Sequence, residues 1–152
     1  MLDRHVLAFC RLGIAGLSPW APGTMGTALA CVIAPICFIP LNIYARCTLL
    51  LIIFVLGGMA ATRAETLLGE KDPGQVVIDE LVGVWLVLLP LESPTFWEYV
   101  GAFVLFRIFD IKKPWPVKSS ENWLPDGWGI MIDDVVAGCW ALLCLETCRA
   151  LL

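Results

Sequence analysis

The stretch "IMIDDVVAGCW", residues 130–140, places two adjacent carboxylates inside an otherwise apolar segment. A second stretch, "VVIDELVGVW" at residues 76–85, repeats this arrangement with an Asp-Glu pair. In both stretches an Ile precedes the acids, and apolar residues, a Gly and a Trp follow them. Because unpaired buried charge is costly, two such pairs indicate a functional site.

The composition predicts one domain that is unusually apolar. The chain has 152 residues, of which 59% are hydrophobic and only 16% are charged, whereas a soluble domain carries about 25% charged residues. This indicates either an integral membrane protein or a helical domain with a large apolar face. The net charge of −4 and the absence of a basic run argue against a nucleic-acid-binding protein.

The seven cysteines form no Cys-x-x-Cys pair, and the chain has a single histidine. This pattern argues against a zinc cluster. We expect the cysteines to be small buried side chains in a reduced protein.

Turn signals containing Pro, Gly or Asn separate the apolar segments, and no long alternating pattern indicates a strand. We therefore predict an all-α fold, a helical bundle embedded in a membrane by several short hydrophobic helices. Residues 2–17 have an amphipathic helical pattern. The apolar segments are residues 28–41, 47–61, 81–91, 99–109 and 130–145.

The positive charges are distributed unevenly if each apolar segment crosses a membrane once. Of the ten Lys and Arg residues, only Arg46 and Arg149 then fall on one side. The positive-inside rule predicts that the other side is cytoplasmic, and that residues 42–46 and 92–98 are external. The polar motifs all share the cytoplasmic side.

The paired acids fit a metal site between two helices. Gly83 follows Asp79 by four residues and Gly138 follows Asp134 by four, and small residues at that spacing let helices approach closely. The acids of both pairs, with no histidine nearby, form an all-oxygen set that suits Mg²⁺. Each pair could instead complement a helix N-terminal dipole. The predicted metal ligands are Asp79, Glu80, Asp133 and Asp134.

The segment "PWAPGTMGTALACVIA" predicts an anion-binding loop at a helix N-terminus. Gly23, Thr24, Gly26 and Thr27 would supply free backbone N–H groups and hydroxyl donors. A terminal Lys-Ser/Thr is absent, so this is not a Walker A loop. The alternative is an ordinary helix with a Thr cap after a Pro-Gly turn.

The segment "FRIFDIKKPWP" gathers Arg107, Asp110 and Lys113 at the end of an apolar helix. The two basic side chains could hold a phosphate, and Asp110 could join the metal ligands or orient a base. The alternative is a basic helix end at a membrane interface.

An anion loop, a carboxylate site and a basic cluster together indicate phosphate-ester chemistry. The sequence lacks a Cys-x5-Arg signature, an Asp-x-Asp following a strand, and the second histidine of paired-histidine phosphatases. Metal-assisted hydrolysis remains, either by direct attack of water or through an aspartyl-phosphate. One alternative is a cation or phosphate transporter with paired intramembrane acids. Another is a membrane scaffold without catalytic activity.

Four segments, "SPWAPGTMGT", "DELVG", "FRIFDIKKPWP" and "GIMIDDVVAG", closely resemble the signature segments of the phosphatidylglycerophosphatase A family. They follow the family's order and extend over residues 18–138. The resemblance implies that residues 1–152 form a single all-α domain. It also implies an Mg²⁺-dependent phosphatase of the inner membrane that converts phosphatidylglycerophosphate to phosphatidylglycerol.

The family's motifs fall on specific residues of this chain. The resemblance implies a phospholipid substrate and a membrane, and it does not imply a protein partner. The acidic motifs, carried over as catalytic, fall on Asp79, Glu80, Asp110, Asp133 and Asp134, and the phosphate-binding motifs on Pro22–Thr27, Arg107 and Lys113.

Overall fold

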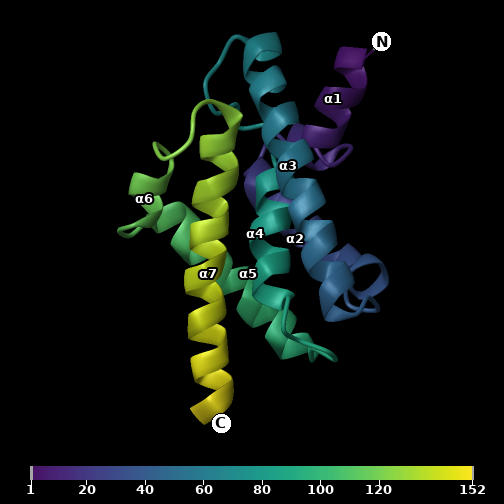
Figure 1. Cartoon of the computed structure of the whole chain (residues 1–152), viewed down its shortest axis with the longest axis vertical. Coiled ribbons are helices and arrows are strands. Elements are labelled where there is room, and N and C mark those ends of the chain that lie inside the picture. The colour runs from purple at the N-terminus through teal and green to yellow at the C-terminus, as the bar shows by residue number, and fades with distance from the viewer. Residues whose placement is uncertain (1, 152) are drawn as a thin grey trace.

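The computed structural model describes residues 2–151, and every regular element within that range is a helix. The all-α prediction is therefore confirmed (Figure 1). The elements are α1 (Leu2–Cys10), the 3₁₀ helix η1 (Ala15–Leu17), α2 (Pro22–Cys37), α3 (Ile43–Leu68), α4 (Ile78–Leu88), α5 (Phe96–Lys112), α6 (Val117–Ser120) and α7 (Gly127–Leu151).

Helix α4 is the centre of the bundle. Ten of its eleven residues are buried, and it packs against α7, α2, α3 and α5 (Figure 1). The indole N–H of Trp85 donates a hydrogen bond to the carbonyl of Ala30, 2.9 Å away, and so joins α4 to α2. Helix α4 is only about 16 Å long. The longer helices α2, α3, α5 and α7 enclose it.

The glycines that follow the two acidic pairs bring α4 and α7 into close contact. A Cβ placed on Gly138 would lie 2.6 Å from the carbonyl oxygen of Gly83. A Cβ on Gly83 would lie 2.3 Å from the ring of Phe106. The predicted close approach of these helices is confirmed, and it fixes how near the two acidic pairs lie.

Helix ends follow the expected turn signals, with one exception. The side chain of Asn42 caps α3 by accepting a hydrogen bond from the N–H of Ala45 at 3.0 Å, and Thr95 forms a capping box that starts α5. The prediction of one amphipathic helix over residues 2–17 is wrong. Leu12 and Gly13 have positive φ, so α1 ends at Cys10 and the chain turns before η1.

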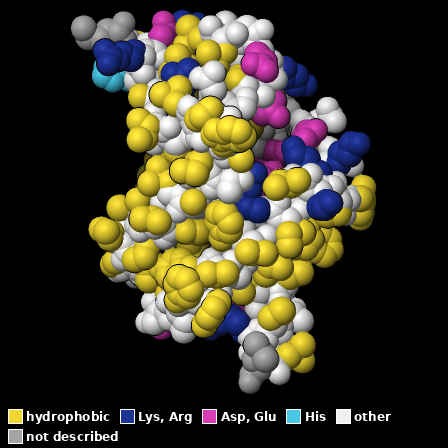
Figure 2. Space-filling view, turned by 180° about the vertical axis from the view of Figure 1, so that it is seen from behind, with side chains coloured by type: hydrophobic (Ala, Val, Ile, Leu, Met, Phe, Trp, Pro, Cys, Tyr) yellow, Lys and Arg dark blue, Asp and Glu magenta, His cyan; other side chains and the backbone are white. Residues whose placement is uncertain are grey.

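Apolar side chains dominate the outer surface of the bundle. Helices α3 and α7 are long and apolar enough to cross a membrane, and only 22% of the apolar window of α3 is buried within the protein. Figure 2 shows charged side chains gathered in the upper half of the view and apolar side chains over most of the lower half. These features fit association with a membrane.

The cysteines are less buried than expected. Cys10 is buried, but four others are exposed, because an outer surface made of apolar helices also uses small apolar side chains. The exposed cysteines are Cys37, Cys47, Cys139 and Cys148.

The connecting segments lie at two ends of the bundle. The turns after α2 and α4 lie at the lower end in Figure 1, with the C-terminal end of α7. The loops between α3 and α4 and between α5 and α7 lie toward the other end, as does the N-terminus. The polar segments thus alternate between the two ends of the bundle, and the side of a membrane that each end faces stays a prediction.

Candidate functional site

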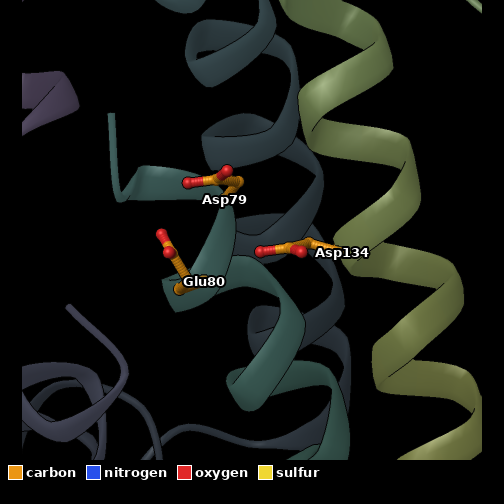
Figure 3. A group of neighbouring side chains, drawn as sticks. All are labelled: Asp79, Glu80 and Asp134. Atoms are coloured by element: carbon orange, nitrogen blue, oxygen red, sulfur yellow. The ribbon is translucent and has the colours of Figure 1, made fainter. Parts of the chain in front are cut away.

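Three carboxylates from two helices form a buried acidic cluster. Asp79 and Glu80 lie in the first turn of α4, and Asp134 extends from α7 toward them (Figure 3). One oxygen from each lies within 4.8 Å of the others, so this acidic cluster could hold a metal ion. We call Asp79, Glu80 and Asp134 the acidic cluster below.

The acidic cluster has unsatisfied oxygens. One carboxylate oxygen of each residue is buried without a hydrogen-bond partner, although native proteins pair nearly all such atoms. Burial raises the pKa of Glu80 to about 8, and the nearby charge of Asp134 adds to the rise. Burial, and then the charge of Glu80, raise the pKa of Asp79 well above its usual range. The unpaired oxygens and their mutual repulsion are what a cation would relieve.

Asp133, the fourth predicted ligand, faces a different partner. Its Oδ2 accepts a hydrogen bond from Nζ of Lys113 at 2.6 Å. Lys113 also pairs with Glu121. Although burial lowers the pKa of Lys113, its hydrogen bonds to the two acids raise it overall. Asp133 is thus linked to the basic segment after α5, and its metal role stays a prediction.

Arg107 joins the acidic cluster to α5. Its Nη1 pairs with Asp110, one turn later on the same helix, and lies 3.7 Å from Oε1 of Glu80. Its Nε is buried without a partner. Asp110 therefore orients the guanidinium and also lies beside Asp134, and its metal role stays a prediction. The guanidinium of Arg107 lines the site and could hold a further anion.

The N-terminus of α2 faces the same place. Pro22 occupies the first turn of α2, and Gly23 follows it. A Cβ on Gly23 would lie 2.2 Å from Oε1 of Glu80 and 3.1 Å from Nη1 of Arg107. A Cβ here would displace the ends of both side chains, so Gly23 lets the N-terminus of α2, which favours anions, lie directly beside Arg107.

The rest of the predicted anion loop does not reach this place. Thr27 is fully buried, and its hydroxyl donates to the carbonyl of Gly23 at 2.9 Å. Gly26 packs against Val77. Both residues lie on the side of α2 that packs into the bundle. Thr24 is half-buried in the first turn, and its role in binding stays a prediction.

These groups surround one cavity of about 340 Å³. Six carboxylates and two basic side chains line it, an excess of four negative charges when all are ionised. A phosphate could not approach such a cavity unless cations or protons offset this charge. The charged lining residues are Asp72, Asp79, Glu80, Asp110, Asp133, Asp134, Arg107 and Lys113.

Two of the residues around this cavity were not singled out from the sequence. Asp72 lines it from the loop before α4, and its place in the polar segment "KDPGQ", just ahead of an acidic pair, was the available signal. Glu121 reaches Lys113 from the residue after α6. No pattern in the segment around Glu121 pointed to that contact.

Comparison with known proteins gives a consistent family. A family model described as phosphatidylglycerophosphatase A matches residues 8–149. The chain is 39% identical over 126 residues to phosphatidylglycerophosphatase A of Escherichia coli, covering 82% of this chain and 72% of the relative. It is 36% identical over 129 residues to phosphatidylglycerophosphatase A of Haemophilus influenzae, covering 85% and 79%.

A third relative carries a different name. The chain is 42% identical over 141 residues to a Bacteroides thetaiotaomicron protein provisionally named phosphatidylinositol-3-phosphatase, covering 89% of this chain and 87% of the relative. No solved structure matches the chain significantly. All three relatives are named as phosphatases of phospholipids.

Proposed function

The chain belongs to the phosphatidylglycerophosphatase A family, and from this premise we propose that it hydrolyses the terminal phosphomonoester of phosphatidylglycerophosphate. The products are phosphatidylglycerol and inorganic phosphate, and the reaction belongs to phospholipid biosynthesis. The observation that carries the proposal is the meeting of the acidic cluster, Arg107 and the N-terminus of α2 around one cavity.

The phosphate lies in the cavity, against Arg107 and the first turn of α2. The guanidinium donates hydrogen bonds to phosphate oxygens, and Asp110 holds it in orientation. The backbone at Gly23 approaches closely because it has no Cβ. Lys113 lines the same cavity and could assist, and Thr24 follows Gly23 in the first turn of α2. Thr27 stabilises the turn that presents Gly23.

The acidic cluster fits Mg²⁺. Its donors are all carboxylate oxygens, the type that Mg²⁺ prefers, and each residue keeps a buried oxygen without a partner. Asp79, Glu80 and Asp134 would hold the ion, with Asp133 as a neighbour. When bound, Mg²⁺ offsets phosphate charge and favours formation of the attacking nucleophile. The cluster's own part is to fix that charge beside Arg107.

The proposed location is the inner membrane, with several crossings and the site on the cytoplasmic side. Eight of ten basic residues lie on the predicted cytoplasmic segments. A cysteine introduced at the exposed Ser93, in a variant lacking the native exposed cysteines, should react with an impermeant maleimide added to intact cells. Labelling only after permeabilisation would reverse the orientation.

Phosphate release by purified protein tests the activity. We expect release from phosphatidylglycerophosphate in Mg²⁺, loss in EDTA, and recovery when Mg²⁺ is restored. Release that persists in EDTA would refute the metal assignment. Acid-quenching a reaction whose substrate carries a labelled phosphate distinguishes direct attack by water from the aspartyl-phosphate route. Only an aspartyl-phosphate keeps the label on the protein.

Phosphatidylinositol 3-phosphate is a second candidate substrate because of the Bacteroides relative. Both lipids offer a phosphomonoester on a diacylglycerol-linked headgroup. Competition between the two at equal surface concentration gives the ratio of kcat/KM directly. Preference for the inositol lipid would reassign the headgroup and leave the phosphatase chemistry in place.

A further inference from the structure

An apolar groove of about 370 Å³ lies outside the catalytic cavity, between α2 and α5. It contains almost no polar surface. One wall is formed by Ala28, Cys31 and Val32 of α2, and the other by Tyr99, Val100 and Phe103 of α5.

The two walls of the groove are continuous with the phosphate-binding end of the site. Helix α2 starts beside the cavity at Gly23, and Ala28 follows about 8 Å along its axis. Helix α5 runs the other way, and Phe103 precedes Arg107 by about 6 Å. Because Phe103 and Arg107 are four residues apart, they share a face of α5, and a molecule held at Arg107 can extend along that face into the groove.

The length of the groove suits a flexible apolar chain. From Arg107 to Phe96, which also lines it, α5 extends about 16 Å. Val32 on the opposite wall lies about 14 Å along α2 from Gly23. A substrate that carries a phosphomonoester at one end and an acyl chain at the other matches this sequence of a polar cavity and an apolar groove.

We propose that the α2–α5 groove binds one acyl chain of the lipid whose phosphomonoester occupies the cavity. This rests on the proposed function, because it assigns the apolar part of the same substrate. The length of the acyl chain, in addition to the headgroup, then determines which lipid substrates the protein prefers.

Filling the groove tests the proposal. Val100→Trp places an indole in the groove, whereas Val104→Trp places one on the exposed side of the same helix, away from the groove lining. We expect Val100→Trp to lower kcat/KM for the dioleoyl substrate about tenfold or more and for a dihexanoyl substrate less than about threefold. Val104→Trp should change neither by more than about twofold. Equal loss on both substrates with Val100→Trp would overturn the proposal.

A binding measurement on the unchanged protein keeps the test independent of folding of the variants. Phosphatidylglycerophosphate with a diazirine at the end of one acyl chain should cross-link to residues 28–32 and 96–103. Unlabelled substrate should suppress this cross-link, and phosphatidylcholine should not. Equal cross-linking by a diazirine phosphatidylcholine would assign the groove to bulk lipid, and cross-linked pairs of chains would assign it to a second copy; either result overturns the proposal.

The two proposals fail differently. Absence of phosphate release from every lipid by the unchanged protein would refute the phosphatase function. Normal release without cross-links in the groove would refute only the acyl-chain assignment.

Discussion

The two ends of α4 bury charge in opposite ways. At its C-terminal end, Arg46 is 4% exposed, and its guanidinium donates hydrogen bonds to the carbonyls of Leu41, Leu89 and Leu91 at 2.9, 3.0 and 2.6 Å. These carbonyls belong to helix ends and turns, which need such donors. At the N-terminal end, the acidic cluster buries carboxylates that repel one another and leave oxygens unpaired.

The difference separates a structural charge from a functional one. The buried guanidinium of Arg46 donates to fixed backbone carbonyls. It therefore joins the turns after α2 and α4 at that end of the bundle. The unpaired carboxylate oxygens of the acidic cluster have no partner within the protein. Their negative charge is balanced only when a cation or protons bind. Removing charge should therefore reduce stability at one end and activity at the other.

The largest effect is expected from Asp79→Asn and Asp134→Asn. Each removes charge that holds the ion, and we expect kcat/KM to fall at least about a hundredfold, about 2.7 kcal/mol of transition-state stabilisation. Without metal, the variants should melt no lower than the unchanged protein, because they relieve repulsion. Phosphate release and thermal melts in detergent measure both effects.

The two Asn variants also distinguish a metal-binding role of the acids from a helix-capping role. An N-terminal Asp replaced by Asn keeps its capping ability to within about 1 kcal/mol. Near-normal turnover in both variants would mean that the pairs only stabilise helix ends. Partial recovery at higher Mg²⁺ would locate the defect in ion affinity.

Arg46→Met should show the opposite pattern. It leaves several carbonyls without a donor, and we expect a loss of about 2 kcal/mol in the free energy of unfolding. The kcat of the folded fraction should stay within about twofold, because Arg46 lies a full helix away from the acidic cluster. A hundredfold loss of kcat with unchanged melting would end the distinction between the two regions.

The effect of Mg²⁺ on stability should grow with pH. Glu80 has a folded pKa of about 8 against 4.5 for an ordinary glutamate, so the metal-free protein binds the extra proton and loses stability as pH rises between these values. Mg²⁺ replaces that proton. The stabilisation of the folded protein by Mg²⁺ should therefore increase by up to about 1.4 kcal/mol for each unit that the pH rises, up to pH 8. Melting with and without Mg²⁺ at pH 6 and pH 8 measures this. A larger shift at pH 6 would contradict it.

The smallest effect is expected from Asp133→Asn. Its carboxylate pairs with Lys113 outside the acidic cluster, so kcat/KM should fall only about fivefold, about 1 kcal/mol. Glu121→Gln is the matched control, since it removes the other acid on Lys113 and should cost less. A hundredfold loss with Asp133→Asn would place it among the metal ligands.

The sequence predicted the contact between α4 and α7 because the information was local. An acid and a Gly four residues later share a helix face, so the close approach at Gly83 and Gly138 carried the acids with it. The turn signals between the apolar segments, one of which contains the α3 cap Asn42, were local in the same sense. Both kinds of feature depend on residues a few positions apart in the chain.

The division of labour between Asp133 and Asp134 was not predictable. Neighbouring residues on a helix point about 100° apart, and only the rotation of α7 against α4 decides which one faces Asp79. The burial of Arg46 and the contact of Glu121 with Lys113 depend on segments far apart in the chain. Such contacts leave no periodic pattern.

The shortness of α4 has a consequence for the energetics of turnover. Its eleven residues set the acidic cluster only about 16 Å from the C-terminal end of α4, well below the upper turns of α3 and α7 (Figure 1). In the proposed membrane setting, a headgroup enters this recess while one tail lies in the α2–α5 groove and the other stays among neighbouring lipids. The enzyme thereby avoids substrate extraction, which costs about 0.8 kcal/mol for each methylene withdrawn. The dephosphorylated lipid leaves by lateral diffusion.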